Sequence, residues 1–76
     1  MERRERVVLP IYGLDCAGAA AAIERALAST GGVLRAYVNP ATETAFMDYD
    51  AGRTDPWLLT LAVEKAGYMS GPPVAA

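Results

Sequence analysis

The chain is poor in the side chains that build disulfide frameworks and most metal sites. Its 76 residues include one cysteine, Cys16, and no histidine. A single cysteine cannot form an internal disulfide, and one copy of the chain cannot assemble the usual zinc ligand sets of cysteines and histidines. The sequence therefore excludes a disulfide-stapled scaffold and a zinc finger.

Strong charge and long apolar runs are also missing. The formal net charge is -2, and the seven Lys and Arg residues are dispersed rather than clustered, which gives no electrostatic footprint for nucleic acid or an acidic membrane. The apolar runs are too short to cross a bilayer, and residues 1–6 lack the apolar core of a signal peptide. We therefore expect a cytoplasmic protein with no nucleic-acid partner and no direct insertion into a membrane.

The length predicts one domain, because a chain this short cannot bury two separate cores. The hydrophobic content of 53% argues against disorder. We expect residues 1–6 to be a charged, solvated N-terminal extension and residues 7–70 to be the domain. Residues 71–76 should be a flexible tail or linker, because Gly71-Pro72-Pro73 interrupts the last apolar segment.

Alternating apolar residues predict three strands and a weak fourth. The first should run from about Val7 to Tyr12, with Val7, Leu9 and Ile11 facing inward. The next two should cover about 33–38 and 43–49. Pro10 cannot donate a backbone hydrogen bond, so its amide side should face an edge or a gap. A short last strand would leave the first strand partly open, which also permits dimerisation by strand pairing.

Two segments carry apolar residues at helical spacing. The first helix should run from about residue 17 to 29, with Asp15 as its cap and Gly31-Gly32 as its end. The second should begin at Pro56, behind the capping pair Thr54-Asp55, and stop at Gly67. Each helix is expected to carry a single buried stripe, with Glu24 and Arg25 facing water. The predicted stripe residues are Ala20, Ile23 and Leu27 with Ala19 or Ala26 in the first helix, and Leu59, Ala62, Val63 and Ala66 in the second.

The order strand, helix, strand, strand, helix, strand predicts an α+β fold. It is typical of a ferredoxin-like βαββαβ sandwich, in which two helices cover one face of an antiparallel sheet. The fourth strand should be short or frayed. In this arrangement Cys16 falls on the turn between the first strand and the first helix. Free cysteines are often small buried hydrophobes, but the turn and the glycines around Cys16 favour exposure.

Several short segments have a pattern in common with a known domain. They are Gly-Leu-Asp-Cys at 13–16, Ile23-Glu24, Ala26-Leu27, Gly32-Val33, Val38-Asn39, Tyr49-Asp50 and the run from Ala62 to Tyr68. Together they resemble the heavy-metal-associated domain, and the resemblance covers about Val7 to Met69. This domain forms small copper chaperones, mercury-binding proteins and the N-terminal modules of metal-pumping P-type ATPases.

The resemblance implies a site for a soft metal ion such as Cu(I). In that family the loop reads Gly-Met-x-Cys-x-x-Cys, and two thiolates near a helix N-terminus bind the ion. Cys16 matches the first ligand, but Ala19 stands at the second. A single thiolate cannot enclose Cu(I), so the ion should be held weakly or shared with a ligand from a second molecule. The implied partner is a metal-transporting P-type ATPase or another copy of the chain.

Two residues after the second helix are possible neighbours of Cys16. Met69 is a possible accessory thioether ligand, and its alternative role is to start the last strand and pack there. Tyr68 matches an aromatic residue that shields the metal loop in bacterial family members. The alternative is a rim tyrosine that packs on the Gly13 turn.

No catalytic constellation is evident, and we do not expect an enzyme. Asp48 and Asp50 are near each other, but carboxylates at a strand end are most often solvated, and no His, Ser or Lys accompanies them. The leading hypothesis is a metal-handling module that acts through Cys16. The alternatives are redox chemistry at Cys16 and a degenerate family member that serves as a non-metal protein-interaction or regulatory domain.

Overall fold

The computed structural model describes residues 3–14 and 17–75. Two sequence predictions fall outside these residues: the cap formed by Asp15 and the placement of Cys16. The backbone on either side of them is described, so the positions at which the chain enters and leaves this loop are known. Ala17 is the first residue of the following helix.

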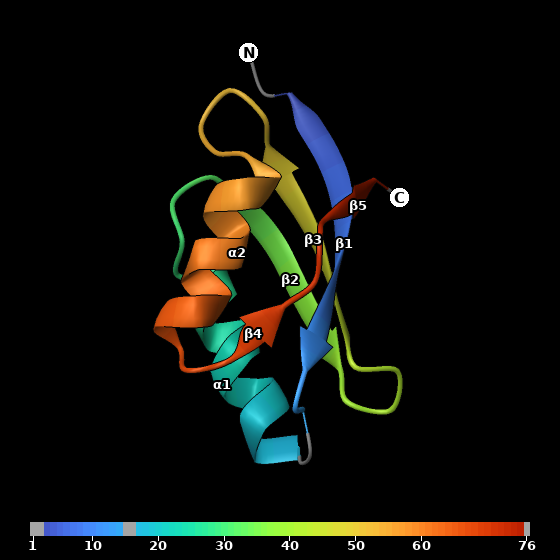
Figure 1. Cartoon of the computed structure of the whole chain (residues 1–76). Helices are drawn as coiled ribbons and strands as arrows, with labels where there is room; N and C mark the ends of the chain where they lie inside the picture. The colour runs from blue at the N-terminus through green and yellow to red at the C-terminus, as the bar shows by residue number, and fades with distance from the viewer. Residues whose placement is uncertain (1–2, 15–16, 76) are drawn as a thin grey trace.

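Two helices cover one face of an antiparallel sheet, which confirms the predicted ferredoxin-like sandwich (Figure 1). The strand order is β2-β3-β1-β4, and β5 also pairs with β1. All strand pairs are antiparallel. The elements are β1 (Arg4–Tyr12), α1 (Ala17–Ala28), β2 (Val33–Asn39), β3 (Thr44–Asp50), α2 (Pro56–Lys65), β4 (Met69–Ser70) and β5 (Val74–Ala75).

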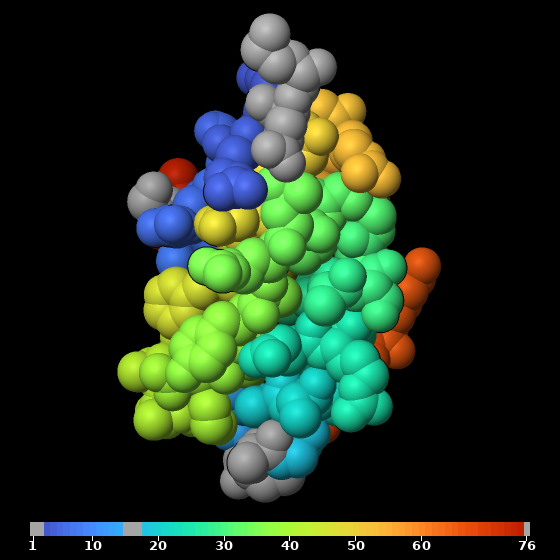
Figure 2. All heavy atoms as spheres, turned by 180° about the vertical axis from the view of Figure 1, so that it is seen from behind, coloured from blue at the N-terminus to red at the C-terminus, as the bar shows by residue number. Residues whose placement is uncertain are grey.

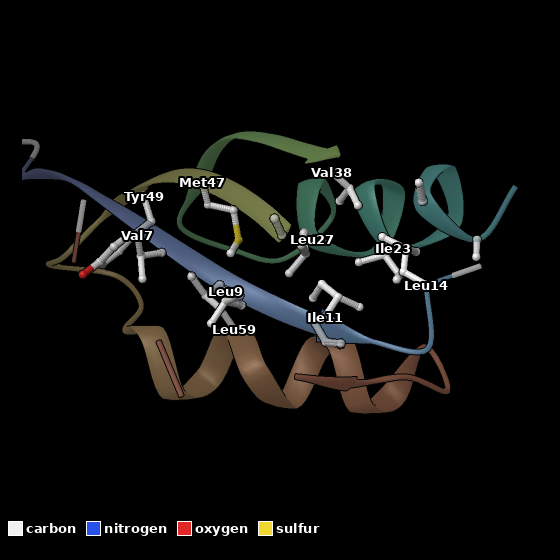
Figure 3. Packing of buried hydrophobic residues seen from close by; sticks show 14 residues of the cluster. Val7, Leu9, Ile11, Leu14, Ile23, Leu27, Val38, Met47, Tyr49 and Leu59 are labelled. Carbon is white, nitrogen blue, oxygen red and sulfur yellow. The ribbon is translucent and has the colours of Figure 1, made fainter. Parts of the chain in front are cut away.

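The core lies between the helices and the inner face of the sheet (Figure 3). On β1, the alternation of Val7, Leu9 and Ile11 toward the core is confirmed, because all three are at most 2% exposed. Such alternation is what a strand with one buried face requires. The other large side chains that are almost completely buried are those of Ile23, Leu27, Met47, Leu59 and Val63.

Pro10 lies beside a gap between two short strands, as the sequence predicts. β4 pairs with Ile11 and Tyr12, and β5 pairs with Val7 and Val8. Between them, the amide of Gly71 donates to the carbonyl oxygen of Pro10 at 2.8 Å. Pro10 accepts this hydrogen bond but has no amide hydrogen to donate in return, so the ladder on this side of β1 is interrupted at the gap.

β4 and β5 thus occupy the second side of β1 at residues 7–8 and 11–12, and the expectation that β1 stays partly open is wrong at these positions. Residues 4–6 of β1 pair with β3 alone among the described residues. Residues Val74 and Ala75, in the segment expected to be a flexible tail, form β5 against β1. β1 also begins three residues earlier than its apolar alternation suggests, since Arg4–Arg6 pair in register with Asp48–Asp50 of β3.

Asp48 is buried, which corrects the expectation of a solvated carboxylate. It is 8% exposed, and its Oδ1 accepts from Nε of Arg6 at 3.0 Å. Arg6 and Arg35 stand opposite Asp48 on the two neighbouring strands. Asp48 therefore has a structural partner, in keeping with the rule that buried charges are paired.

The helical pattern predicts that Glu24 faces water, but in the structure its carboxylate has a partner. It is half-buried, and its Oε2 accepts from the amide of Val38 at 3.1 Å. β2 is the edge strand, so this amide has no strand partner. Figure 2 shows the side on which α1 (teal) lies against β2 (green). The carboxylate thus protects one position of an exposed sheet edge.

The second helix is apolar on more than its buried side. Leu59 and Val63 are fully buried as predicted, but Trp57, Leu58 and Leu61 are 66%, 48% and 48% exposed. The expectation of one apolar stripe per helix is therefore wrong for α2.

Neither α1 nor α2, the helices of the described residues, has the length and apolar character of a membrane span.

Candidate metal-binding loop

The loop that contains Cys16 is anchored by the buried Leu14 on one side and by the start of α1 on the other. β1 ends at Tyr12, and Gly13 has φ 77°, a left-handed conformation that glycine adopts without strain. Leu14 is 3% exposed and lies in the core cluster at the α1 end, with Ile23 and Val38 (Figure 3). The chain then enters α1 at Ala17. The two residues between these anchors are Asp15 and Cys16.

The position of the missing second thiol lies in the first turns of α1. Ala19 is 6% exposed and belongs to the core cluster, whereas Gly18 beside it is exposed. A side chain at position 19 therefore faces the interior at the helix end that carries the loop. The N-terminus of a helix also bears a partial positive charge, which lowers the pKa of a nearby thiol and favours thiolate.

Tyr68 is positioned by the end of α2. Gly67 has φ 94°, and its amide donates to the carbonyl of Glu64 at 2.9 Å, while the amide of Tyr68 donates to the carbonyl of Val63 at 3.2 Å. These bonds close the helix in the manner of a glycine C-cap. Tyr68 is half-buried and packs against the core cluster. Its role as a shield for Cys16 stays a prediction.

Met69 lies at the surface beside the strand that leads into the loop. It pairs with Tyr12 in the ladder between β4 and β1, and both side chains are exposed, at 69% and 55%. Met69 thus starts the last strand, but its thioether is not packed in the core. Its accessibility is compatible with a ligand role, which stays a prediction because Cys16 lies outside the described residues.

The described residues offer no site for a hard metal ion. Among them, no group of three or more His, Cys, Asp or Glu side chains is placed to hold a metal. Asp50 instead organises the neighbouring loop, because its Oδ1 accepts from the amides of Gly52 at 2.9 Å and Arg3 at 3.2 Å. These two hydrogen bonds hold the pKa of Asp50 below its usual value. The sulfur atoms of Cys16 and Met69 are the donors that suit a soft ion.

Comparison with known proteins places these features in a family. Residues 8–69 match the family model of the heavy-metal-associated domain. The chain is 45% identical over 64 residues to a probable copper-transporting ATPase, PacS, of Synechocystis sp.; the match covers 84% of this chain and 8% of the ATPase. It is 37% identical over 68 residues to the copper-exporting P-type ATPase of Bacillus subtilis, with 90% and 8% covered. The chain therefore spans about a twelfth of the length of these relatives.

Solved structures share the fold over almost their whole length. The N-terminal domain of PacS from Synechocystis superposes with a TM-score of 0.78 at 40% identity, covering 88% of this chain and 94% of that domain. Oxidized MerP from Ralstonia metallidurans gives a TM-score of 0.87 at 28% identity, with 91% and 96% covered. The family model matches most of the chain, and the relatives agree with it in sequence and fold. The chain belongs to the heavy-metal-associated domain family.

Proposed function

We propose that this chain binds a soft metal ion, in the first place Cu(I), through the thiolate of Cys16 and passes it to a second protein. The observation that carries the proposal is that Cys16 is retained in a loop whose two anchors, Leu14 and α1, keep the family fold. Two of the chain's relatives are the probable copper-transporting ATPase PacS of Synechocystis sp. and the copper-exporting P-type ATPase of Bacillus subtilis. We place the chain in the cytoplasm and regard it as a binding module rather than an enzyme.

The ion should not be fully enclosed by one chain. Cu(I) prefers two or more soft ligands, and position 19 supplies a methyl group instead of a second thiolate. An open coordination position invites a sulfur from outside, either from a metal-transporting P-type ATPase or from Cys16 of another copy. Met69 is the accessory ligand that the same chain can offer, because its thioether is exposed beside Tyr12.

An anaerobic titration with Cu(I) against a chromophoric competitor tests the proposal. Replacing the thiol in Cys16→Ser should abolish competitive binding, whereas Met69→Leu should weaken it only if the thioether contributes. Equal binding by Cys16→Ser and the parent would contradict the proposal. It would favour the alternative of a degenerate family member that acts as a non-metal interaction domain.

Restoring the second thiol is the complementary test. Ala19→Cys should raise Cu(I) affinity on the order of 10²-fold or more, because chelation makes binding of the second ligand intramolecular. The matched control is Ala22→Cys, which adds a thiol at an exposed position of the same helix. A similar gain in both variants would show that the loop does not hold the family geometry.

The sharing of the ion between two copies is tested by size. With Cys16 as the only thiol, Cu(I) should produce a dimer with one ion per two chains on size-exclusion chromatography. The dimer should dissociate when a Cu(I) chelator is added, and Cys16→Ser should stay monomeric. A dimer that persists with chelator and reductant would require a different interface.

A further inference from the structure

The outer side of α2 carries apolar side chains that the core does not use. The first charged residue of this helix is Glu64, its ninth residue. While Leu59 and Val63 point into the core, Leu58 and Leu61 are each 48% exposed. A helix that served only the core would carry polar side chains on its outer face. Nothing within the described residues covers this second stripe.

A shallow groove of about 300 Å³ runs beside the stripe. Leu58 and Leu61 line it together with the turn at Thr30 and Gly31. Its only ionisable lining residues are Arg53, which precedes α2, and Lys65, which ends it. A helix of ten residues is about 15 Å long. The groove therefore has an apolar middle with a cation near each end of α2.

Both cations are available to a partner. The one ion pair within residues 3–14 and 17–75 joins Arg6 to Asp48, on the sheet. Asp50 lies near Arg53, but its carboxylate accepts from backbone amides and does not line the groove. The chain as a whole has a net charge of -2, so this cationic groove is a local departure. Its electrostatic complement is an acidic surface.

We propose that this groove docks a helical segment of another protein, whose apolar side chains are flanked by carboxylates about three helical turns apart. The apolar side chains lie against Leu58 and Leu61, in the manner of an amphipathic helix in a hydrophobic groove. The two carboxylates pair with Arg53 and Lys65. This docking surface does not include Cys16, and the proposal does not rest on metal binding.

A second copy of the chain does not fit this role. If the two-fold axis is perpendicular to the α2 helices, they run antiparallel and Lys65 of one copy meets Arg53 of the other. If the axis runs along the helices, they are parallel and each cation meets its own counterpart. Like charges are set together in both arrangements. The exposed residues of α1 are no better, since Ala21, Ala22 and Arg25 offer no carboxylate. The occupant is therefore an acidic helix that belongs to a different protein.

The test uses a designed probe of this chemistry and the full chain labelled with ¹⁵N. The probe is a 15-residue lactam-bridged helix with leucines along one face and a glutamate pair at each end; the control peptide has lysines in place of the glutamates. We expect amide shifts confined to α2, the Arg53-Thr54 segment before it and the Thr30-Gly31 turn with the acidic peptide, and none with the basic one. Cys16→Ser should bind the acidic peptide as the parent does.

Charge and apolar variants separate the proposal from nonspecific adhesion. The double variant Arg53→Glu, Lys65→Glu should bind the acidic peptide about tenfold or more weakly, whereas Arg25→Glu, an exposed cation outside the groove, should bind normally. Leu61→Ser should weaken binding, and Leu34→Ser, at an exposed leucine of β2, should not. Absence of binding, equal binding of both peptides, shifts elsewhere, or self-association of the free chain through α2 in sedimentation experiments would each overturn the proposal.

Discussion

Gly32 combines a left-handed backbone with close neighbours that leave no space for a side chain. It has φ 93°, and a Cβ added there would stand 2.8 Å from Cγ2 of Thr54. Gly32→Ala should therefore lower the free energy of unfolding by about 2 kcal/mol or more, through left-handed strain and a steric clash. Gly31→Ala is the control, because a Cβ there meets nothing within 4 Å. Urea unfolding of the two variants measures the difference, and equal losses would contradict this account.

Asp50 gives the fold a dependence on acid. The amides of Gly52 and Arg3 lower its pKa below 3.8 in the folded chain, so the ionised form is favoured by folding. The stabilisation is present above the unfolded pKa of about 4 and is lost as the pH falls through the lower folded value. Asn at position 50 keeps a side-chain oxygen that can accept from the same two amides but carries no charge. The stability advantage of the parent over Asp50→Asn should therefore shrink between pH 5 and pH 2 in urea unfolding. An advantage that does not change over this range would refute the role of the charge.

Single residues were predictable where their neighbours in sequence decide their role. The glycines that end the helices have left-handed backbones at 32 and 67, and Leu59 is in the core. Asp48 and Glu24 were not predictable, because their partners are Arg6 and the amide of Val38, far away in sequence. The register of β1 on β3 and the packing of α1 on β2 bring these pairs together.

At the scale of elements, the edge strand β2 depends on a side chain from α1. Glu24→Ala should remove the acceptor for the amide of Val38 and lower the free energy of unfolding by about 1 kcal/mol. Exposure of the edge should also increase association of the variant at high concentration. Glu24→Gln keeps an acceptor and should lose less. Thermal unfolding and light scattering check both effects, and identical behaviour of the two variants would argue against edge protection.

The boundaries of the helices and strands followed the apolar pattern closely, except at the start of β1 and at β5. β1 extends back to Arg4 because β3 continues to Asp50 and offers ladder partners to charged residues. β5 forms although two prolines precede it, because β1 has free backbone groups at Val7 and Val8. Local sequence carries neither signal, since both strands are completed by a distant partner.

The free energy of unfolding of the whole molecule is small enough that one buried leucine can decide whether the chain stays folded. Leu58 and Leu59, neighbours in α2, show this by their different burial. A chain of this size is stabilised by about 4–11 kcal/mol. Leu59 is fully buried and Leu58 is half exposed, so Leu59→Ala should cost about 3–5 kcal/mol and Leu58→Ala about 1 kcal/mol or less. Circular dichroism during urea unfolding measures both. Similar losses would mean that α2 packs differently.

The sandwich and the loop could be predicted from sequence, whereas the outer face of α2 could not. Strand and helix order sets the topology, and the residues around Cys16 identify the family. Helical spacing places Leu59 and Val63 in the core, but it does not tell whether the neighbouring Leu58 and Leu61 are covered. Their exposure depends on how the whole helix is rotated against the sheet.

The gap at Pro10 has a consequence for how the chain opens. β4 and β5 are held to β1 by separate hydrogen-bonded pairs, with Gly71 and the two prolines between them. Opening of the final residues can therefore proceed as far as Pro72 without breaking the pairs at Ile11 and Tyr12. Amide hydrogens of β5 should exchange with solvent much faster than that of Gly71, which donates to the carbonyl oxygen of Pro10. Opening of β5 is thereby kept away from the end of β1 that leads to Cys16.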